Sequence, residues 1–203
     1  MKILNLYAGI GGNRKLWGNE HEITAVENVP EIAKIYQDFF PNDKVIIADA
    51  HQYLLKHYKE FDFIWSSPPC PTHSRIRLFS AVARGQNKAV YPDMKLYEEI
   101  IFLMFNFDGK FVVENVVGYY EPLIKPSQYK SHYYWSNFSI MGSKEGYRAH
   151  NSINEELEDI KGFDLSNYDR IDKKKILRNC VEPEAGLYVF NCAFKIRQET
   201  IFK

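Results

Sequence analysis

The sequence predicts an α/β domain with a mostly parallel sheet that is covered by helices on both faces. Along residues 2–114, apolar runs typical of strands alternate with segments of helical periodicity, which is the pattern of parallel α/β folds. Most of these runs are apolar throughout, as expected for strands that are buried on both faces. The 203 residues are 45% hydrophobic and 26% charged, a composition that suits one ordinary globular domain.

Five apolar runs are the expected strands of this sheet. They lie at residues 2–7, 23–27, 45–48, 61–65 and 111–114. Three connecting segments carry apolar side chains at helical spacing or are long enough for a short helix. They are residues 30–39, 52–57 and 93–104. The first begins with a proline and the last with an aspartate, and both residue types are favoured where a helix starts.

A cluster of glycines follows the first strand. It occupies the segment Tyr7-Ala8-Gly9-Ile10-Gly11-Gly12. After it, Asn13 is expected to open a helix through Leu16 and Trp17. A strand, a glycine turn and a helix in this order let a ligand approach the backbone N–H groups of the helix N-terminus. The alternative interpretation is a plain tight turn that binds nothing.

Four chemically useful side chains stand at the ends of the expected strands. Glu27, Asp49 and Glu114 follow the second, third and fifth strands. Cys70 follows the fourth strand after two prolines, which cannot donate to a sheet ladder and so force the chain out of the sheet. Parallel strands end at one edge, where α/β folds bind their ligands. Glu27 is placed to hold ribose hydroxyls, with a helix-capping or surface carboxylate as the alternative, and Cys70 is either a nucleophile or an incidental loop thiol.

The periodicity weakens after residue 117. Residues 133–138 are rich in aromatic side chains and are expected to add a sheet segment. Residues 141–175 are expected to form loops and short elements. Pro183 is expected to start a closing helix with a shared apolar face. That face consists of Leu187, Phe190, Phe194 and Ile201.

The formal net charge is zero, but the charges are unevenly distributed. Residues 71–92 contain four basic residues and no acidic ones. The four are Arg75, Arg77, Arg84 and Lys88. Residues 154–172 carry seven acids against two basic residues, which is typical of a solvated face. The basic run differs because it begins directly after Cys70.

The remaining composition indicates a soluble protein of the cytoplasm. Three scattered cysteines are too few for a disulfide framework or a zinc site, so no metal is expected, and they suit a reducing compartment. No apolar run reaches the length of a membrane span, and the N-terminus runs into a strand pattern rather than a signal peptide.

Five stretches of the chain resemble motifs of the cytosine-5 methyltransferase family. They are Tyr7-Ala8-Gly9-Ile10-Gly11-Gly12, Pro68-Pro69-Cys70, Glu114-Asn115-Val116, Lys130-Ser131-His132-Tyr133-Tyr134-Trp135-Ser136-Asn137 and Arg178-Asn179-Cys180-Val181. Their order and spacing agree with the family over nearly the whole chain. The resemblance implies a Rossmann-like fold of the S-adenosylmethionine-dependent methyltransferases.

The resemblance also implies the chemistry. In this family a cysteine thiolate adds to carbon 6 of cytosine, and carbon 5 can then attack a methyl donor. The resemblance assigns this addition to Cys70, and contact with N3 and the Watson–Crick edge to Glu114. It makes Arg75, Arg77 and His132 candidates to anchor the base carbonyl and a nearby phosphate. The implied substrate is a cytosine flipped out of DNA.

The implied methyl donor is S-adenosylmethionine, which leaves as S-adenosylhomocysteine. The glycine turn would approach its amino-acid end, while Glu27 would hold the ribose and Asp49 the adenine. The residues that the resemblance assigns to this pocket are Tyr7, Ala8, Gly9, Ile10, Gly11, Gly12, Glu27, Asn28, Asp49, Ala50, Pro68, Asn179 and Val181.

The chain departs from the family pattern at several positions. Pro71 replaces the glutamine that is common after the cysteine, and Arg178 stands where the family has glycine. The family's Arg-x-Arg pair is replaced by Lys130 and His132. Only about forty residues separate Asn137 from Asn179, where the family inserts a target-recognition domain.

Three regions are therefore expected. They are a catalytic core at 1–140, a reduced target-recognition region at 141–177, and a C-terminal segment and helix at 178–203 that return to the core. The second region is acidic, and acidic surface repels DNA. Sequence selectivity is then slight, or comes from residues 71–92, or is supplied by a second chain.

Three functions follow from these observations. The first is a DNA cytosine-5 methyltransferase, as in restriction–modification, working in the cytoplasm of a bacterial or phage-infected cell. The second is a related enzyme acting on RNA or single-stranded nucleic acid, which needs no base flipping. The third is a non-catalytic regulatory subunit with the same fold. The presence of Cys70, Glu114 and Glu27 together counts against the third.

Overall fold

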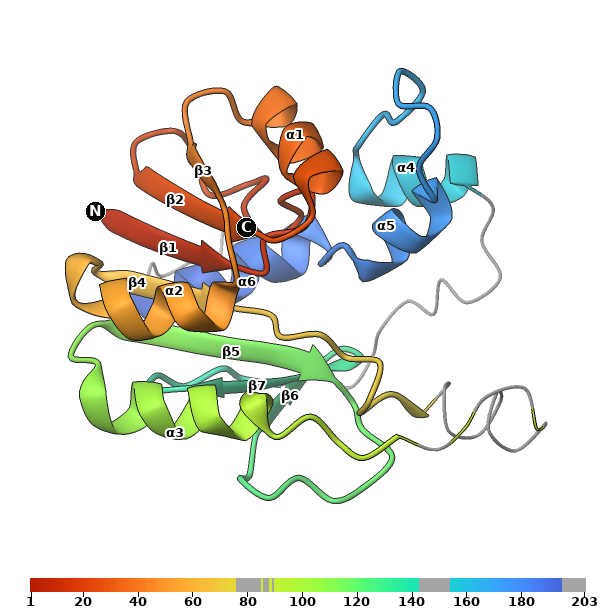
Figure 1. Cartoon of the computed structure of the whole chain (residues 1–203). Helices are drawn as coiled ribbons and strands as arrows, with labels where there is room; N and C mark the ends of the chain where they lie inside the picture. The colour runs from red at the N-terminus through yellow and green to blue at the C-terminus, as the bar shows by residue number, and fades with distance from the viewer. Residues whose placement is uncertain (76–84, 86–87, 89, 143–153, 195–203) are drawn as a thin grey trace, which may run out of the picture.

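The computed structural model describes residues 1–75, 85, 88, 90–142 and 154–194. Its centre is a seven-stranded sheet in the order β3-β2-β1-β4-β5-β7-β6 (Figure 1). The strands from β3 to β5 in this order are parallel, whereas β7 and β6 run antiparallel. The predicted α/β fold with a mostly parallel sheet is confirmed.

The elements follow the predicted order along the chain. The strands are β1 (Lys2–Leu6), β2 (Glu22–Glu27), β3 (Lys44–Ile47), β4 (Phe63–Ser66), β5 (Lys110–Val116), β6 (Ser127–Tyr129) and β7 (His132–Ser136). The helices are α1 (Pro30–Phe39), α2 (Ala50–His57), the 3-10 helix η1 (Tyr58–Glu60), α3 (Lys95–Asn106), α4 (Asn154–Lys161), α5 (Lys173–Asn179) and α6 (Pro183–Phe194). The strands predicted before residue 117 are all present, with boundaries shifted by at most two residues.

Helices cover both faces of the sheet because successive side chains of a strand point to opposite sides. Figure 1 shows α2 and α3 in front of the sheet and α6 behind it. The front layer is built from Leu4, Leu6, Leu54, Ile64, Ile100, Leu103, Phe111 and Val113. The layer under α6 is built from Ile3, Trp17, Ile23, Phe63, Trp65, Val112, Val189 and Phe190.

The helix predicted from Asn13 through Trp17 is wrong, because this described segment forms turns. Asn13 Nδ2 donates to Asn5 Oδ1 on β1 at 2.7 Å. The next side chain is held elsewhere, since Arg14 Nε lies 2.9 Å from Asp43 Oδ2 and both side chains are 3% exposed. These two buried polar contacts hold neighbouring side chains in different directions. The segment therefore forms turns, although the spacing of its apolar residues predicts a helix.

The segment of α4 and α5 packs back onto the core instead of forming a separate body. Figure 1 shows the two helices side by side, next to α1. Their apolar side chains, among them Leu157 and Leu177, form one cluster with Ile10 of the glycine loop and Ile35 of α1. The prediction of loops and short elements for residues 141–175 agrees with this arrangement over residues 154–175.

The longest described helices, α3 and α6, have 12 residues each. Within the ranges that the structure describes, no helix has the length and apolar character needed to cross a membrane. Helix α6 starts at Pro183 as predicted, whereas Ile201 lies outside the described residues.

Candidate active site

The loop that carries Cys70 is fixed to β5. Asn115 is 2% exposed, and its Nδ2 donates to the Pro68 carbonyl at 2.9 Å. The carbonyl of Cys70 then accepts from the backbone N–H groups of His73 at 2.9 Å and Ser74 at 3.0 Å. Because hydrogen bonds hold both Pro68 and the turn after Cys70, the cysteine has a defined position at the carboxyl edge of the sheet.

A second attachment joins the end of this loop to the chain after β5. Ser74 forms an isolated antiparallel bridge with Gly118. The exposed Arg75 donates from Nε to the Gly118 carbonyl at 2.7 Å. Lys88 is exposed. The other two basic residues of the run, Arg77 and Arg84, lie outside the described residues.

Cys70, Glu114 and His132 come together at this edge. Burial, followed by the negative charge of Glu114, raises the pKa of the Cys70 thiol to about 11. Glu114 is 6% exposed, and its Oε1 lies 3.6 Å from Nε2 of His132. The two residues are neighbours because β5 pairs with β7, which places His132 opposite Val116. At neutral pH the cysteine is therefore a protonated thiol beside a carboxylate.

Lys130 is occupied elsewhere. Its Nζ lies 2.7 Å from Glu182 Oε2, directly before α6. Its backbone has a φ of +51° at the turn between β6 and β7. Of the Lys130 and His132 pair that replaces the family's two arginines, the histidine is thus the one that lies beside Glu114.

The glycine loop combines open space with close packing. Gly9 has a φ of +55°, and a side chain there would meet no atom within 4 Å. At Gly11, with a φ of +87°, a side chain would run into the ring of Tyr36. At Gly12 it would run into the Val181 carbonyl. Gly9 therefore borders space that a ligand can fill, and the other two glycines let α1 and the chain before α6 approach.

Two of the predicted carboxylates hold backbone N–H groups. Glu27 is 8% exposed and accepts from Gly9 N through Oε2 and from Val29 N through Oε1, both at 3.0 Å. A carboxylate offers about four lone-pair sites, so two remain for a ligand. Asp49 is exposed and caps α2, because its Oδ1 accepts from Gln52 N at 2.8 Å.

The other residues predicted for the methyl-donor pocket differ in their exposure. Asn28 and Asn179 are exposed, and Val181 and Tyr7 are half-buried. The buried members are Ala8, Ile10, Ala50 and Pro68. Among the residues that the structure describes, no group of three His, Cys, Asp or Glu side chains is placed to hold a metal ion.

A buried carboxylate that the sequence analysis missed connects the start of the glycine loop with the end of β4, which leads into the loop that carries Cys70. Glu99 of α3 is fully buried. Its Oε1 accepts from the Tyr7 hydroxyl at 2.5 Å, and its Oε2 accepts from the Ser66 hydroxyl at 2.6 Å. His51 Nδ1 lies 3.1 Å from the same carboxylate. Glu99 therefore links the residue before the glycine loop to the last residue of β4.

The charge of Glu99 also affects its neighbours. Its hydrogen bond raises the pKa of His51, and burial together with Glu99 raises the pKa of Tyr7 well above its usual value. The sequence holds a signal for this residue. Glu99 lies three residues after Leu96 and four before Leu103, so it is an acid on the apolar face of a predicted helix.

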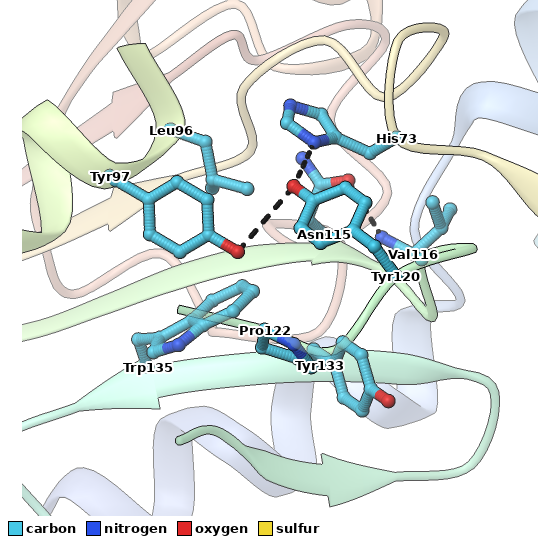
Figure 2. A pocket seen from close by; sticks show the side chains of 10 residues that line it. His73, Leu96, Tyr97, Asn115, Val116, Tyr120, Pro122, Tyr133 and Trp135 are labelled. Atoms are coloured by element: carbon cyan, nitrogen blue, oxygen red, sulfur yellow. Dashed lines mark hydrogen bonds between the residues drawn. The ribbon is translucent and has the colours of Figure 1, made fainter. Parts of the chain in front are cut away.

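A small hollow lies beside the Cys70 loop (Figure 2). Figure 2 shows His73 and Tyr97 pointing toward the Tyr120 hydroxyl, which lies 2.6 Å from His73 Nδ1 and 3.4 Å from the Tyr97 hydroxyl. Burial lowers the pKa of His73, so its ring is neutral near pH 7. The remaining lining residues are Leu96, Asn115, Val116, Gly118, Pro122, Tyr133 and Trp135.

The strand order, the glycine loop after β1 and the acid after β2 define the fold of the S-adenosylmethionine-dependent methyltransferases. Residues 1–155 match the sequence profile of the family described as C-5 cytosine-specific DNA methylase. This match covers more than half of the 203 residues, and the chain belongs to that family.

A comparison with one solved structure agrees with this fold. The Entamoeba histolytica methyltransferase EhMeth is similar with a TM-score of 0.56 at 10% identity, over 96% of this chain and 98% of that one. A variant of Spodoptera frugiperda DNMT2 has a TM-score of 0.44 at 21% identity, over 71% of this chain and 53% of that one. A search of curated proteins found no match.

The cofactor of this family is S-adenosylmethionine, as expected from the sequence. The residues present fit it. Gly9 borders open space at the end of β1, and Glu27 next to it keeps lone pairs free. The open space at Gly9 is thus close to a carboxylate that can accept from ribose hydroxyls.

Proposed function

We propose that this chain methylates carbon 5 of cytosine in DNA through a covalent adduct with Cys70. The observation that carries the proposal is the grouping of Cys70, Glu114 and His132 at the carboxyl edge, where Asn115 of β5 holds the loop that carries Cys70. A thiol, a carboxylate and an imidazole at one edge are the groups that addition to a pyrimidine ring needs.

The first step is the addition of Cys70 to carbon 6. The sulfur lone pair forms the S–C6 bond, and the ring electrons move toward N3. Since the pKa of this thiol is raised to about 11, its proton has to be taken up as the bond forms. Glu114 acts on the thiol electrostatically and is a base able to receive that proton.

The second step neutralises the ring. Glu114, once protonated, donates to N3 of the base, so that carbon 5 becomes an enamine carbon. His132, at 3.6 Å from the Glu114 carboxylate, stabilises the ionised acid when its imidazole is protonated. S-adenosylmethionine, when bound, supplies a methyl group on a positively charged sulfur.

The last steps restore the enzyme. When carbon 5 carries the methyl group, it loses its proton to solvent, the C5–C6 double bond re-forms, and the S–C6 bond breaks. Cys70 leaves as a thiolate, N3 returns its proton to Glu114, and Glu114 passes this proton back to the Cys70 sulfur. The net change is the replacement of one ring hydrogen by a methyl group and the release of one proton.

The substrate we propose is duplex DNA with the target cytosine flipped out, because carbon 6 is not accessible within a stacked helix. Residues 141–177 form the reduced target-recognition region in this proposal, between the core at 1–140 and the returning segment at 178–203. Leu157 and Leu177 of this region pack against Ile10 of the glycine loop.

The test measures transfer of a tritiated methyl group to duplex DNA, single-stranded DNA and tRNA. We expect duplex DNA to be the best acceptor. With duplex DNA that contains 5-fluorocytosine, the protein should form an adduct that survives denaturation, because fluorine at carbon 5 blocks the final elimination. The Cys70→Ser variant should form no adduct and transfer no methyl group, while its thermal unfolding stays close to that of the parent.

The matched control is Cys192→Ser, which removes a partly buried thiol on α6, away from the loop that carries Cys70. It should keep both activities. Turnover by Cys70→Ser would overturn the covalent mechanism. Transfer to tRNA in preference to both DNA forms would assign the same chemistry to an RNA substrate.

A further inference from the structure

One buried side chain in the turn after Cys70 has no role in the steps above. Of residues 71–75, only His73 is buried, with 2% of its surface exposed. His73 therefore attaches this turn to the interior of the domain. Its backbone also contacts the nucleophile residue directly, because the His73 N–H donates to the Cys70 carbonyl at 2.9 Å.

A chain of hydrogen bonds leads from α3 to the side chain of His73. The Leu123 N–H donates to the Tyr97 hydroxyl at 3.2 Å, and this hydroxyl donates to the Tyr120 oxygen at 3.4 Å. The Tyr120 hydroxyl in turn lies 2.6 Å from Nδ1 of His73 (Figure 2). A backbone N–H can only donate, so it sets the direction in which each hydroxyl passes its proton along the chain. This direction makes Nδ1 of His73 the acceptor and assigns the ring proton to Nε2.

The orientation of the His73 ring depends on Tyr120. Nε2 of His73 is buried and has no hydrogen-bond partner among the residues that the structure describes. The two rings are tilted against each other, with their centroids 5.9 Å apart. Because burial lowers the pKa of His73, the ring stays neutral near pH 7 and Nδ1 keeps its lone pair for the Tyr120 hydroxyl. Loss of this hydroxyl would leave both ring nitrogens without a described partner.

We propose that Tyr97, Tyr120 and His73 are positioning residues that hold Cys70 in line with carbon 6 of the base. This inference rests on the proposed function, because it concerns the nucleophile of that reaction. The chain joins α3, the loop after β5 and the turn that follows Cys70. Its last link is the hydrogen bond from the His73 backbone to the Cys70 carbonyl. A nucleophile that is displaced by about 1 Å can lose about a hundredfold in rate.

The alternative is that His73 only fills space beside Leu96 and Trp135 in the small hollow. A packing role depends on the volume of the side chain, whereas a positioning role depends on an acceptor at Nδ1. His73→Leu fills more volume than His73→Asn but accepts no hydrogen bond. His73→Asn keeps an oxygen acceptor close to the place of Nδ1. We expect faster methyl transfer by His73→Asn than by His73→Leu, and packing alone predicts the reverse order.

Tyr120→Phe is the mildest direct test, because it removes a single oxygen atom. We expect its kcat for methyl transfer to fall about ten- to a hundred-fold. Its KM for DNA and its affinity for S-adenosylhomocysteine should stay unchanged, since the chain orients Cys70 and binds neither substrate. Tyr97→Phe acts only through Tyr120 and should give a smaller loss of the same kind. The control is Tyr119→Phe, which removes a neighbouring hydroxyl outside the chain and should keep the parent rate.

Alkylation of the cysteines gives a readout that needs no methyl transfer. When the turn is no longer held, the Cys70 thiol becomes more exposed and ionises more easily. Iodoacetamide should therefore modify Cys70 in Tyr120→Phe about tenfold faster than in the parent, which corresponds to a decrease of about one unit in its pKa. Cys180 is buried and serves as the internal reference for opening of the core. Its rate of modification should equal that in the parent.

Three results would overturn the proposal. They are an unchanged kcat for Tyr120→Phe, a faster transfer by His73→Leu than by His73→Asn, and an equal increase in the alkylation of Cys70 and Cys180, which would indicate a general loss of stability. Failure of the proposed function is distinguishable. A parent protein that methylates no nucleic acid would refute the reaction, while faster alkylation of Cys70 alone in Tyr120→Phe would still show that the chain holds this residue.

Discussion

Replacing Glu99 by glutamine tests whether one buried carboxylate holds both the glycine loop and the loop that carries Cys70. Glu99→Gln keeps the size and shape of the side chain but removes its charge. In the parent, the carboxylate accepts from the hydroxyls of Tyr7 and Ser66 and lies 3.1 Å from His51 Nδ1. An amide has one carbonyl oxygen, so it cannot replace all three contacts.

The magnitude follows from these contacts. A hydrogen bond to a charged group contributes about 1.5–3 kcal/mol. In the variant, the amide oxygen can keep one acceptor contact, and the amide NH2 group can donate to the Ser66 hydroxyl oxygen. The free energy of unfolding should therefore fall by about 2–4 kcal/mol. For a chain of this size the melting temperature should drop by about 5–15 °C. The fold should survive, since domains have about 5–15 kcal/mol of stability.

The loss should depend on pH through His51. Glu99 raises the pKa of folded His51 above its unfolded value, which is about 6.5. The stabilisation from this pair is fully present below the unfolded pKa and is lost as the pH rises through the folded pKa. The difference between parent and variant should therefore be larger near about pH 6 than near about pH 9.

Urea denaturation at both pH values measures these differences. The control is Glu98→Gln on the same helix, because Glu98 is 62% exposed and lies 3.8 Å from His51 Nε2. An exposed pair of this kind contributes about 0–1 kcal/mol. A loss for Glu99→Gln below about 0.5 kcal/mol, or one that is equal at both pH values, would refute the reasoning.

Two further variants test the pocket and the nucleophile. Glu27→Ala removes the acceptor for the backbone N–H groups of Gly9 and Val29 and the proposed ribose contact. Calorimetry should show about a ten- to hundred-fold weaker affinity for S-adenosylhomocysteine. An unchanged affinity would mean that Glu27 has only a structural role. Glu114→Gln removes a negative charge that raises the pKa of Cys70. Iodoacetamide should therefore alkylate this thiol faster than in the parent near about pH 8, as measured by mass spectrometry. An equal or slower rate would contradict the influence of Glu114 on Cys70.

The parts of the fold that the sequence predicts well depend on strong local signals. The strand that ends at Glu27 and the helix that starts at Pro30 each have an apolar pattern and a defined boundary. The carboxyl edge follows from them, because parallel strands place their ends together. The grouping of Cys70 with Glu114 could be expected for this reason.

Other parts depend on contacts between residues far apart in the sequence. The turns after the glycine loop result from the burial of Arg14 with Asp43, which no local pattern encodes. The sequence predicts a solvated face for the acidic stretch that contains Lys161, yet Lys161 is buried and lies four residues after the buried Leu157 on the same helical face. A short helix with one apolar side chain per turn gives too weak a periodicity to show which of its charged residues are buried.

The close approach of the two ends of the described chain affects how the methyl-donor pocket forms during synthesis. Gly12 leaves no room for a side chain because Cys180 and Val181 lie against it, and Trp17 Nε1 donates to the Gly186 carbonyl at 3.3 Å. These contacts span most of the sequence, and such long-range contacts form late. A nascent chain on the ribosome can therefore pair its first strands early, but it completes the glycine-loop side of the pocket only after α6 has emerged.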